Sequence, residues 1–304
     1  MNDTNPDAKR QLFYELFQPG TITLIIGSFF IGIGLAYHLG GTIKWGAGLF
    51  LLAAFLFLIW ARNFLNSYWD HPNSPISLLR STHHRFTELN STKRNSLLTY
   101  ALFCLTAAAL CFMLSMELYR FSLVLGILIL FVFALVMMSS LPPLLLTRKG
   151  YAELIEAFVV FILVPAAAMI LNYGELNPIL ELLTVPLFFV FLAGKLVFSL
   201  RTYLEDKTGG YPNLLNRLDW EKATRLHNGL ILLTYVLVAV FSVIGLPWHF
   251  TWPILLTLPI AAFELIQVVG ITRGGKPNWK ILEWTSGSLV GSMCYLVLLT
   301  LWLH

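Results

Sequence analysis

The sequence contains little charge and few cysteines. Only 12% of its 304 residues are Asp, Glu, Lys or Arg, whereas 57% are hydrophobic and the mean hydropathy is +0.74. A soluble domain of this length could not bury so much apolar surface, so the composition indicates that the bilayer is the solvent. The three cysteines, Cys104, Cys111 and Cys294, lie in apolar runs without CxxC or CxxH spacing. Neither a disulfide framework nor a zinc site is supported.

Several motifs of soluble enzymes are also missing from the sequence. It contains no P-loop, no nucleophile elbow and no cluster of histidines with metal-ligand spacing. Its basic residues gather in connections between apolar runs, where membrane topology already explains them. We therefore expect no nucleic-acid partner.

Long apolar runs fill most of the chain. A membrane-spanning helix needs about 20 apolar residues, and its backbone polar groups must be satisfied within the segment. Nine runs meet this requirement: 20–38, 45–62, 97–116, 121–141, 152–171, 179–200, 229–247, 251–271 and 283–303. The sequence predicts an all-α integral membrane protein with nine transmembrane helices in a single domain over residues 1–304. Long polar connections at about 63–96 and 201–228 would cap it.

Basic residues predict the orientation of the chain. Seventeen of the 20 Lys and Arg fall in the N-terminal segment and in the connections after the even-numbered spans. The opposite side has only Lys44 and Arg120, and Lys195 lies within a span. By the positive-inside rule, we expect a multi-pass cell-membrane protein with a cytoplasmic N-terminus and with His304 outside.

Two polar helix ends close the second and sixth spans. Residues 63–70 and 199–206 align without a gap at a separation of 136 positions, and each ends in Asp. An offset of four spans keeps both copies in the same orientation, which predicts a parallel repeat of two four-helix halves followed by one further helix.

The first helix end carries oxygen donors on one face. Asn63, Asn66 and Asp70 are three and four positions apart, so they share a helical face. Such amide and carboxylate oxygens suit a hard cation such as Mg²⁺. A solvated, capped helix terminus is the alternative interpretation of the same residues.

The second helix end adds a cation to the pattern. Lys195, Ser199, Thr202 and Asp206 again share one face, and Lys195 lies well inside its apolar run. An ionisable residue within a span indicates function by default, and a lysine beside a cation–carboxylate site suits a diphosphate. The alternative is a lysine that snorkels to the membrane interface.

Further ionisable residues lie beside or within the spans. Arg62 and Arg201 flank the two motifs, where they would add bidentate phosphate contacts or serve topology and headgroup binding. Glu264 is a mid-span carboxylate that would orient an acceptor, act as a base, or bond to Gln267 between helices.

Segments throughout the chain resemble one family. Residues 61–70 resemble the first aspartate-rich motif of the UbiA superfamily of intramembrane prenyltransferases, commonly Asn-x-x-x-Asp-x-x-x-Asp. Residues 200–209 resemble the second motif, commonly Asp-x-x-x-Asp followed by a basic residue and Gly. Residues 17–21 are similar to the start of the family's first helix. Residues 141–154 are similar to the stretch before its fifth helix, especially in the menaquinone-type, MenA-like branch.

The resemblance implies a UbiA-like fold and a transferase activity. A polyprenyl diphosphate would bind with Mg²⁺, and a hydrophobic or aromatic acceptor would receive the prenyl chain. The catalytic residues would be Asp70, Asp206 and Lys195, and the metal ligands would be Asn66, Asp70 and Asp206. The substrate-binding residues would be Arg62, Asn63, Asn66, Ser199, Arg201, Thr202 and Tyr203.

Both motifs are depleted in acids. Ser74 stands where the first motif commonly ends in Asp, and Thr202 stands where the second commonly begins with Asp. Three hypotheses therefore stay open: a prenyltransferase, a terpene cyclase that needs no external acceptor, and a non-catalytic protein that binds isoprenoids or quinones.

Overall fold

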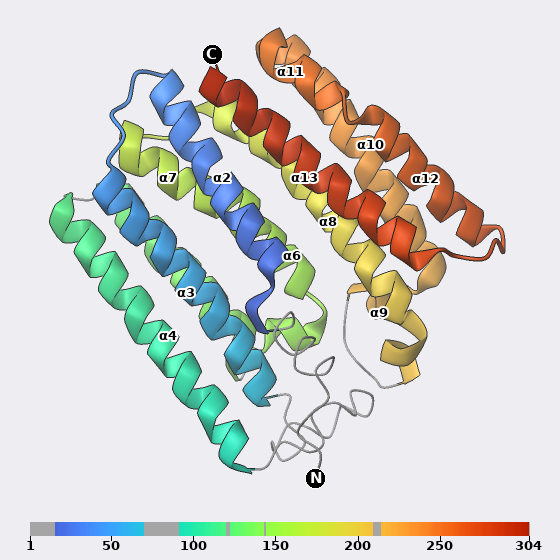
Figure 1. Ribbon diagram of the computed structural model, residues 1–304, viewed down its shortest axis with the longest axis horizontal. Coiled ribbons are helices and arrows are strands. Elements are labelled where there is room, and N and C mark those ends of the chain that lie inside the picture. Colours follow the sequence, from blue (N-terminus) through green and yellow to red (C-terminus); the bar gives the residue numbers. More distant parts are fainter. Residues whose placement is uncertain (1–15, 70–90, 120–121, 143, 209–213, 304) are drawn as a thin grey trace.

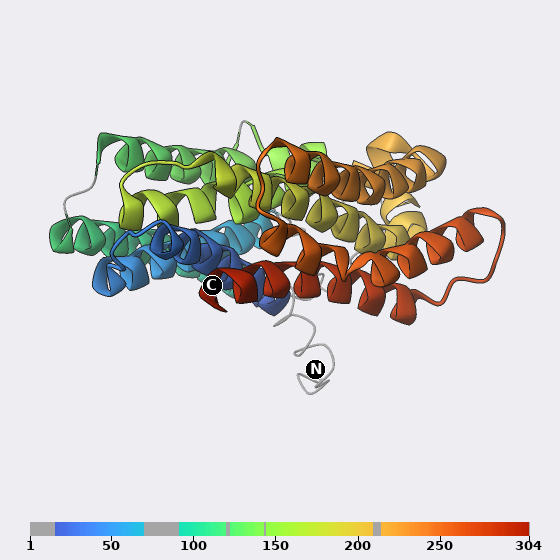
Figure 2. The same cartoon turned by 90° about the horizontal axis from the view of Figure 1, so that it is seen from above.

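The computed structural model describes residues 16–69, 91–119, 122–142, 144–208 and 214–303. Within these ranges, the side chains at 91–94, 148, 202, 204–208, 216 and 217 are not described. The described residues fold into helices that lie side by side at similar tilts and pack in more than one layer (Figures 1 and 2). The helices are α2 (Pro19–His38), α3 (Trp45–Trp69), α4 (Ser91–Leu118), α5 (Leu123–Ser140), α6 (Ala152–Phe158), α7 (Val164–Tyr173), α8 (Pro178–Thr208), α9 (Leu214–Leu218), α10 (Trp220–Ile244), α11 (Trp248–Leu255), α12 (Leu258–Thr272) and α13 (Trp279–Leu303).

The predicted all-α membrane fold is confirmed. Within the described ranges, eight helical segments are long and apolar enough to cross a bilayer, and α11 with α12 forms a ninth span bent by 40°. Pro253 inside α11 and Pro259 in the first turn of α12 explain the bend, because proline lacks the N–H that a continuous helix needs. Thr257 at the break donates a hydrogen bond to the Ile254 carbonyl at 2.6 Å.

The outer surface of the helices is apolar. Leu123 at the start of α5 is 81% exposed, and Val243 near the end of α10 is 87% exposed. An exposed apolar surface of this extent is unfavourable in water and favourable against lipid tails. The exposure pattern therefore agrees with the composition in assigning the bilayer as solvent.

Helix pairing follows the predicted repeat. In Figure 1, α3 packs beside α4 and α8 packs beside α10, which are equivalent pairs under an offset of four spans. The last helix, α13, packs against both α2 and α8, and thus joins the two halves. This arrangement brings α3 and α8, the helices that carry the two motifs, into one bundle.

The fifth span contains a break in its α-helical geometry. The π-helical segment η3 (Val159–Leu163) joins α6 to α7, and such segments are frequent near functional sites. Beside it, α2 and α7 approach closely. A Cβ atom added at Gly32 would lie 2.2 Å from the carbonyl oxygen of Pro165, so only glycine fits at this position.

The connection predicted at 201–228 is mostly helical. Helix α8 continues to Thr208, and α10 begins at Trp220 rather than near residue 229. The first turns of α10 are amphipathic, because Ala223 and His227 are buried while Glu221 and Arg225 form an exposed ion pair at 2.8 Å. The polar residues that suggested a loop therefore cover the outer face of a helix. At the other long connection, residues 70–90 lie outside the described ranges.

Candidate functional site

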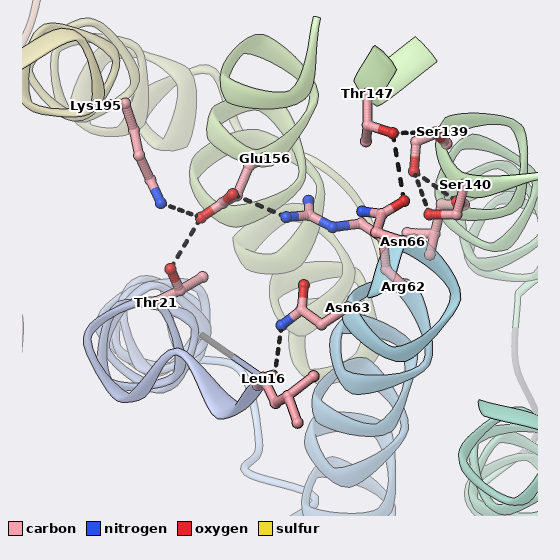
Figure 3. A network of polar contacts seen from close by, with 11 residues as sticks. Leu16, Thr21, Arg62, Asn63, Asn66, Ser139, Ser140, Thr147, Glu156 and Lys195 are labelled. Carbon is pink, nitrogen blue, oxygen red and sulfur yellow. Dashed lines mark hydrogen bonds and ion pairs between the residues drawn. The ribbon is translucent and has the colours of Figure 1, made fainter. Parts of the chain in front are cut away.

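The Glu156 carboxylate is the centre of a buried polar cluster (Figure 3). Its Oε1 atom lies 2.6 Å from Lys195 Nζ and accepts a hydrogen bond from Thr21 Oγ1 at 2.8 Å. Its Oε2 atom accepts a bond from Arg62 Nη2 at 2.9 Å. These residues belong to α6, α8, α2 and α3 respectively, so one carboxylate joins four helices from both halves of the protein. We call Thr21, Arg62, Glu156 and Lys195 the Glu156 cluster.

Local sequence explains how each side chain reaches the cluster. Helix α2 begins with Pro19, which is favoured in a first turn and places Thr21 there. Glu156 lies in the second turn of α6, shortly before the π segment. Lys195 lies about three turns before the end of α8. The four side chains thus come from the first turn of α2, from the second turn of α6, from two turns before the end of α3, and from the interior of α8.

Burial makes the loss of either partner of the Arg62–Glu156 ion pair costly. Glu156 is 4% exposed and Arg62 is 3% exposed, so both charges have left water and each needs its partner. Arg62 retains a buried Nε donor that has no hydrogen-bond partner among the described residues. The Lys195 side chain is 23% exposed and is the more accessible cation. The cluster therefore offers donors to an anion beyond those that Glu156 occupies.

The two asparagines of the first motif have different surroundings. Asn63 is buried, and its Nδ2 atom donates to the Leu16 carbonyl at 3.0 Å, so it ties the chain before α2 to α3. Asn66 is half-buried and lies one helical turn after Arg62. Among the described residues, its Oδ1 atom accepts one long bond, at 3.3 Å from Thr147, whose hydroxyl also donates to the Ser139 carbonyl at 2.9 Å. Asn66 is therefore the amide with an oxygen suited to a ligand.

Helix α8 runs without interruption past the second motif. Its length places the backbone of residues 195, 199, 202 and 206 along one face of a single helix. The Ser199 hydroxyl donates to the Lys195 carbonyl at 3.2 Å, within the same helix. The Thr202 and Asp206 side chains belong to those not described, and Asp70 lies outside the described ranges.

Arg201 and Tyr203 lie on other faces of α8. Arg201 is exposed and pairs with Glu283 of α13, at 3.0 Å from Nη1 to Oε1. The Tyr203 hydroxyl donates to Asp219 Oδ1 at 2.5 Å and thereby ties α8 to the start of α10. The structure thus brings Arg62 and Lys195 together but does not bring Arg201 and Tyr203 to them.

A second buried polar pair lies between α10 and α12. His227 Nε2 is 3.1 Å from Glu264 Oε1, and both residues are fully buried. The other ring nitrogen of His227 lies 3.0 Å from Asn228 Oδ1. Gln267, the partner considered for Glu264, instead donates to Thr285 at 3.1 Å. The mid-span carboxylate is therefore a helix–helix contact in this structure.

The described donors fit a hard cation only in part. Among the residues whose positions the structure describes, no three His, Cys, Asp or Glu side chains gather as a metal site. The Asn66 amide oxygen, which accepts a long hydrogen bond from Thr147, is the type of donor that Mg²⁺ accepts beside carboxylates and waters. The carboxylates that the sequence predicts as further ligands, Asp70 and Asp206, are not among the described side chains.

Glu156 and Thr21 did not emerge as site residues from the sequence. The available signal was the presence of opposite charges within the spans, since intramembrane ionisable residues tend to pair with one another. Lys195 and Glu156 are such a pair, but sequence spacing cannot show that the fifth and sixth spans bring them into contact.

Comparison with known proteins places the chain in a family. A model of the UbiA prenyltransferase family matches residues 27–286, and the chain belongs to this family. No curated protein matches the sequence. The finer resemblance to the menaquinone-type branch stays a prediction.

Solved structures share the fold over nearly the whole chain. A UbiA homologue from Archaeoglobus fulgidus, bound to DMAPP and Mg²⁺, is 16% identical; the match covers 94% of this chain and 98% of that one, with a TM-score of 0.55. A digeranylgeranylglyceryl phosphate synthase is 15% identical, with 97% and 98% covered and a TM-score of 0.55. At these identities the similarity shows a common architecture.

Proposed function

We propose that the protein is a membrane prenyltransferase that moves a polyprenyl group from its diphosphate to a hydrophobic, aromatic acceptor. The observation that carries this proposal is the Glu156 cluster, which holds Arg62 of α3 and Lys195 of α8 together inside the bundle. A buried arginine and a partly exposed lysine between the motif helices of a UbiA-family chain suit a diphosphate. The apolar helices around them suit a prenyl chain.

Each predicted residue has a role in this proposal. Lys195 and Arg62 bind phosphate oxygens, because Lys195 is partly exposed and Arg62 has an unused Nε donor. Asn66, Asp70 and Asp206 hold Mg²⁺ through oxygen atoms. When bound, Mg²⁺ neutralises charge on the departing diphosphate. The fixed cations of the protein stabilise the same developing charge without reorganisation.

The remaining polar motif residues support these groups. Asn63 fixes the start of α2 against α3, and Ser199 and Thr202 line the face of α8 between Lys195 and Asp206. Arg201 and Tyr203, which are paired elsewhere, hold α8 against α13 and α10. In this proposal they position the helix rather than bind the diphosphate.

The ligands of similar proteins support the choice of donor and metal. The A. fulgidus homologue is bound to DMAPP and Mg²⁺, and DMAPP is a prenyl diphosphate. A menaquinone-type acceptor is our preferred aromatic class, on the resemblance of residues 141–154. The distribution of Lys and Arg supports a cytoplasmic N-terminus and an external C-terminus.

A non-catalytic role is the second candidate. Ser74 and Thr202 replace two motif acids, and fewer carboxylates bind fewer metal ions. A protein with the same fold and the same buried cluster would then bind an isoprenoid or quinone without ionising a diphosphate.

Incubation with donors distinguishes these functions. Purified protein would be mixed with Mg²⁺ and a panel of prenyl diphosphates, with and without aromatic acceptors, and diphosphate release would be followed. We expect release that needs an acceptor. Release with a cyclised, acceptor-free product would indicate the cyclase, and no release with any donor would leave only the binding protein.

A further inference from the structure

Glu156 occupies both cations that a diphosphate would use. One carboxylate oxygen lies 2.6 Å from Lys195 Nζ, and the other lies 2.9 Å from Arg62 Nη2. Glu156 makes both contacts and also accepts a hydrogen bond from Thr21. The Glu156 carboxylate therefore neutralises one of the cluster's two positive charges before any ligand arrives.

A second acidic residue, Glu153, lies close to Glu156 in the chain. Glu153 lies one helical turn before Glu156 on α6, and its Oε2 atom is buried without a hydrogen-bond partner among the described residues. A second acidic side chain thus lies one helical turn from the carboxylate that pairs with both cations. Because the surroundings are apolar, the charges of the cluster are weakly screened and each one matters more than it would in water.

The charge of the ligand must suit the charges of these side chains. A free diphosphate carries several negative charges, and it would meet the Glu156 carboxylate as soon as it reached Lys195. The complex of a diphosphate with Mg²⁺ carries much less negative charge, so Glu156 opposes it less. We propose that Glu156 is a specificity-determining residue, which makes the Arg62–Lys195 site bind a diphosphate as its complex with a divalent cation and exclude the metal-free anion. This inference rests on the proposed function, since it assumes that a diphosphate binds there.

Binding of inorganic diphosphate tests the inference without turnover. Affinity would be measured by calorimetry on detergent-purified full-length protein, once with Mg²⁺ and once with EDTA. We expect the wild type to bind at least tenfold more weakly in EDTA. Glu156→Gln removes the opposing charge and can keep the hydrogen bond from Thr21, so its affinity in EDTA should rise at least tenfold. The ratio of the affinity in Mg²⁺ to the affinity in EDTA should therefore fall.

Charge-matched variants separate electrostatics from a local change of structure. The double variant Arg62→Gln/Glu156→Gln has the same net charge as the wild type and should regain a large Mg²⁺ to EDTA ratio. Glu221→Gln removes a carboxylate from an exposed Arg–Glu pair on α10 and should leave the ratio unchanged. If Glu156→Gln does not fold, Glu153→Gln should raise the affinity in EDTA about threefold, because it removes an acidic side chain one helical turn from Glu156 without breaking an observed ion pair.

The outcomes separate this inference from the function on which it rests. A wild-type affinity in EDTA equal to that in Mg²⁺ would overturn the inference without any variant. An unchanged ratio in folded Glu156→Gln would also overturn it, even with Mg²⁺-dependent diphosphate release intact. If the wild type binds no diphosphate in either condition, the proposed function itself fails.

Discussion

Lys195 of α8 and Glu156 of α6 form an ion pair at 2.6 Å inside the helix bundle. The same carboxylate holds Arg62 of α3, so the helices that carry the two aspartate-rich motifs are fixed through the fifth span. The two cations of the site are therefore members of one cluster and share the Glu156 carboxylate as counterion.

Removal of Glu156 should destabilise the protein strongly. Glu156→Ala leaves Arg62 buried without its counterion, which costs about 3–5 kcal/mol. Arg62→Met should cost less, because Glu156 keeps Lys195 and Thr21 as partners. Thermal unfolding in detergent would measure both, with the exposed pair variant Glu221→Ala as the control. Equal unfolding midpoints for Glu156→Ala and Glu221→Ala would contradict the description of the cluster.

Close packing of α2 on α7 gives a second prediction. Gly32→Ala places a Cβ atom 2.2 Å from the Pro165 carbonyl oxygen, and such overpacking costs about 1–3 kcal/mol. Gly126→Ala on α5 is the matched control, because a Cβ there meets nothing within 4 Å. Alanine removes the flexibility of a helical glycine, so the control should unfold at the same or a higher temperature. A Gly32→Ala protein as stable as the control would argue against this contact.

The buried His227–Glu264 pair should stabilise the folded protein. His227→Ala leaves the Glu264 carboxylate buried without the partner seen here, and we expect a loss of about 3–5 kcal/mol. Replacing both residues by Leu removes both polar groups and should recover most of that loss. Unfolding midpoints of the single and double variants would measure both effects. A double variant no more stable than His227→Ala would show that the pair does more than join α10 to α12.

The orientation can be checked with single cysteines. After replacement of Cys104, Cys111 and Cys294, Lys276→Cys would mark the turn between α12 and α13, and Glu175→Cys would mark the turn between α7 and α8. In intact cells, a membrane-impermeant maleimide should label only the cysteine at 175, because the positive-inside rule places 276 in the cytoplasm. Labelling at 276 alone would reverse the predicted topology.

Apolar length predicted the spans well, because a bilayer demands about 20 apolar residues in each. It placed the start of α10 too late, because Glu221 and Arg225, which cover the outer face of the helix, suggested a loop. Spacing placed Asn63 and Asn66 on one face of α3, but the two amides have different partners, the Leu16 carbonyl and Thr147. It could not reveal Glu156, because that residue acts through contacts with three other helices, and such contacts depend on packing rather than on periodicity.

Packing also separated residues that sequence had grouped. Arg201 and Lys195 both belong to the end of α8, but their six-residue separation puts them on different faces, and Arg201 turns to Glu283. Proximity along the chain predicted a shared phosphate site, whereas the helical geometry assigns them different partners.

Mg²⁺-dependent release of diphosphate from a prenyl diphosphate tests the central claim most directly. The rate would be measured for wild type, Asp70→Asn and Asp206→Asn, with Glu221→Gln as a control for a lost acidic charge. We predict release by the wild type and the control, and a fall of about 100-fold or more in each Asp variant, because each removes charge stabilisation at the leaving group. Release that is unaffected by both Asp substitutions, or no release by the wild type with any donor, would contradict the account.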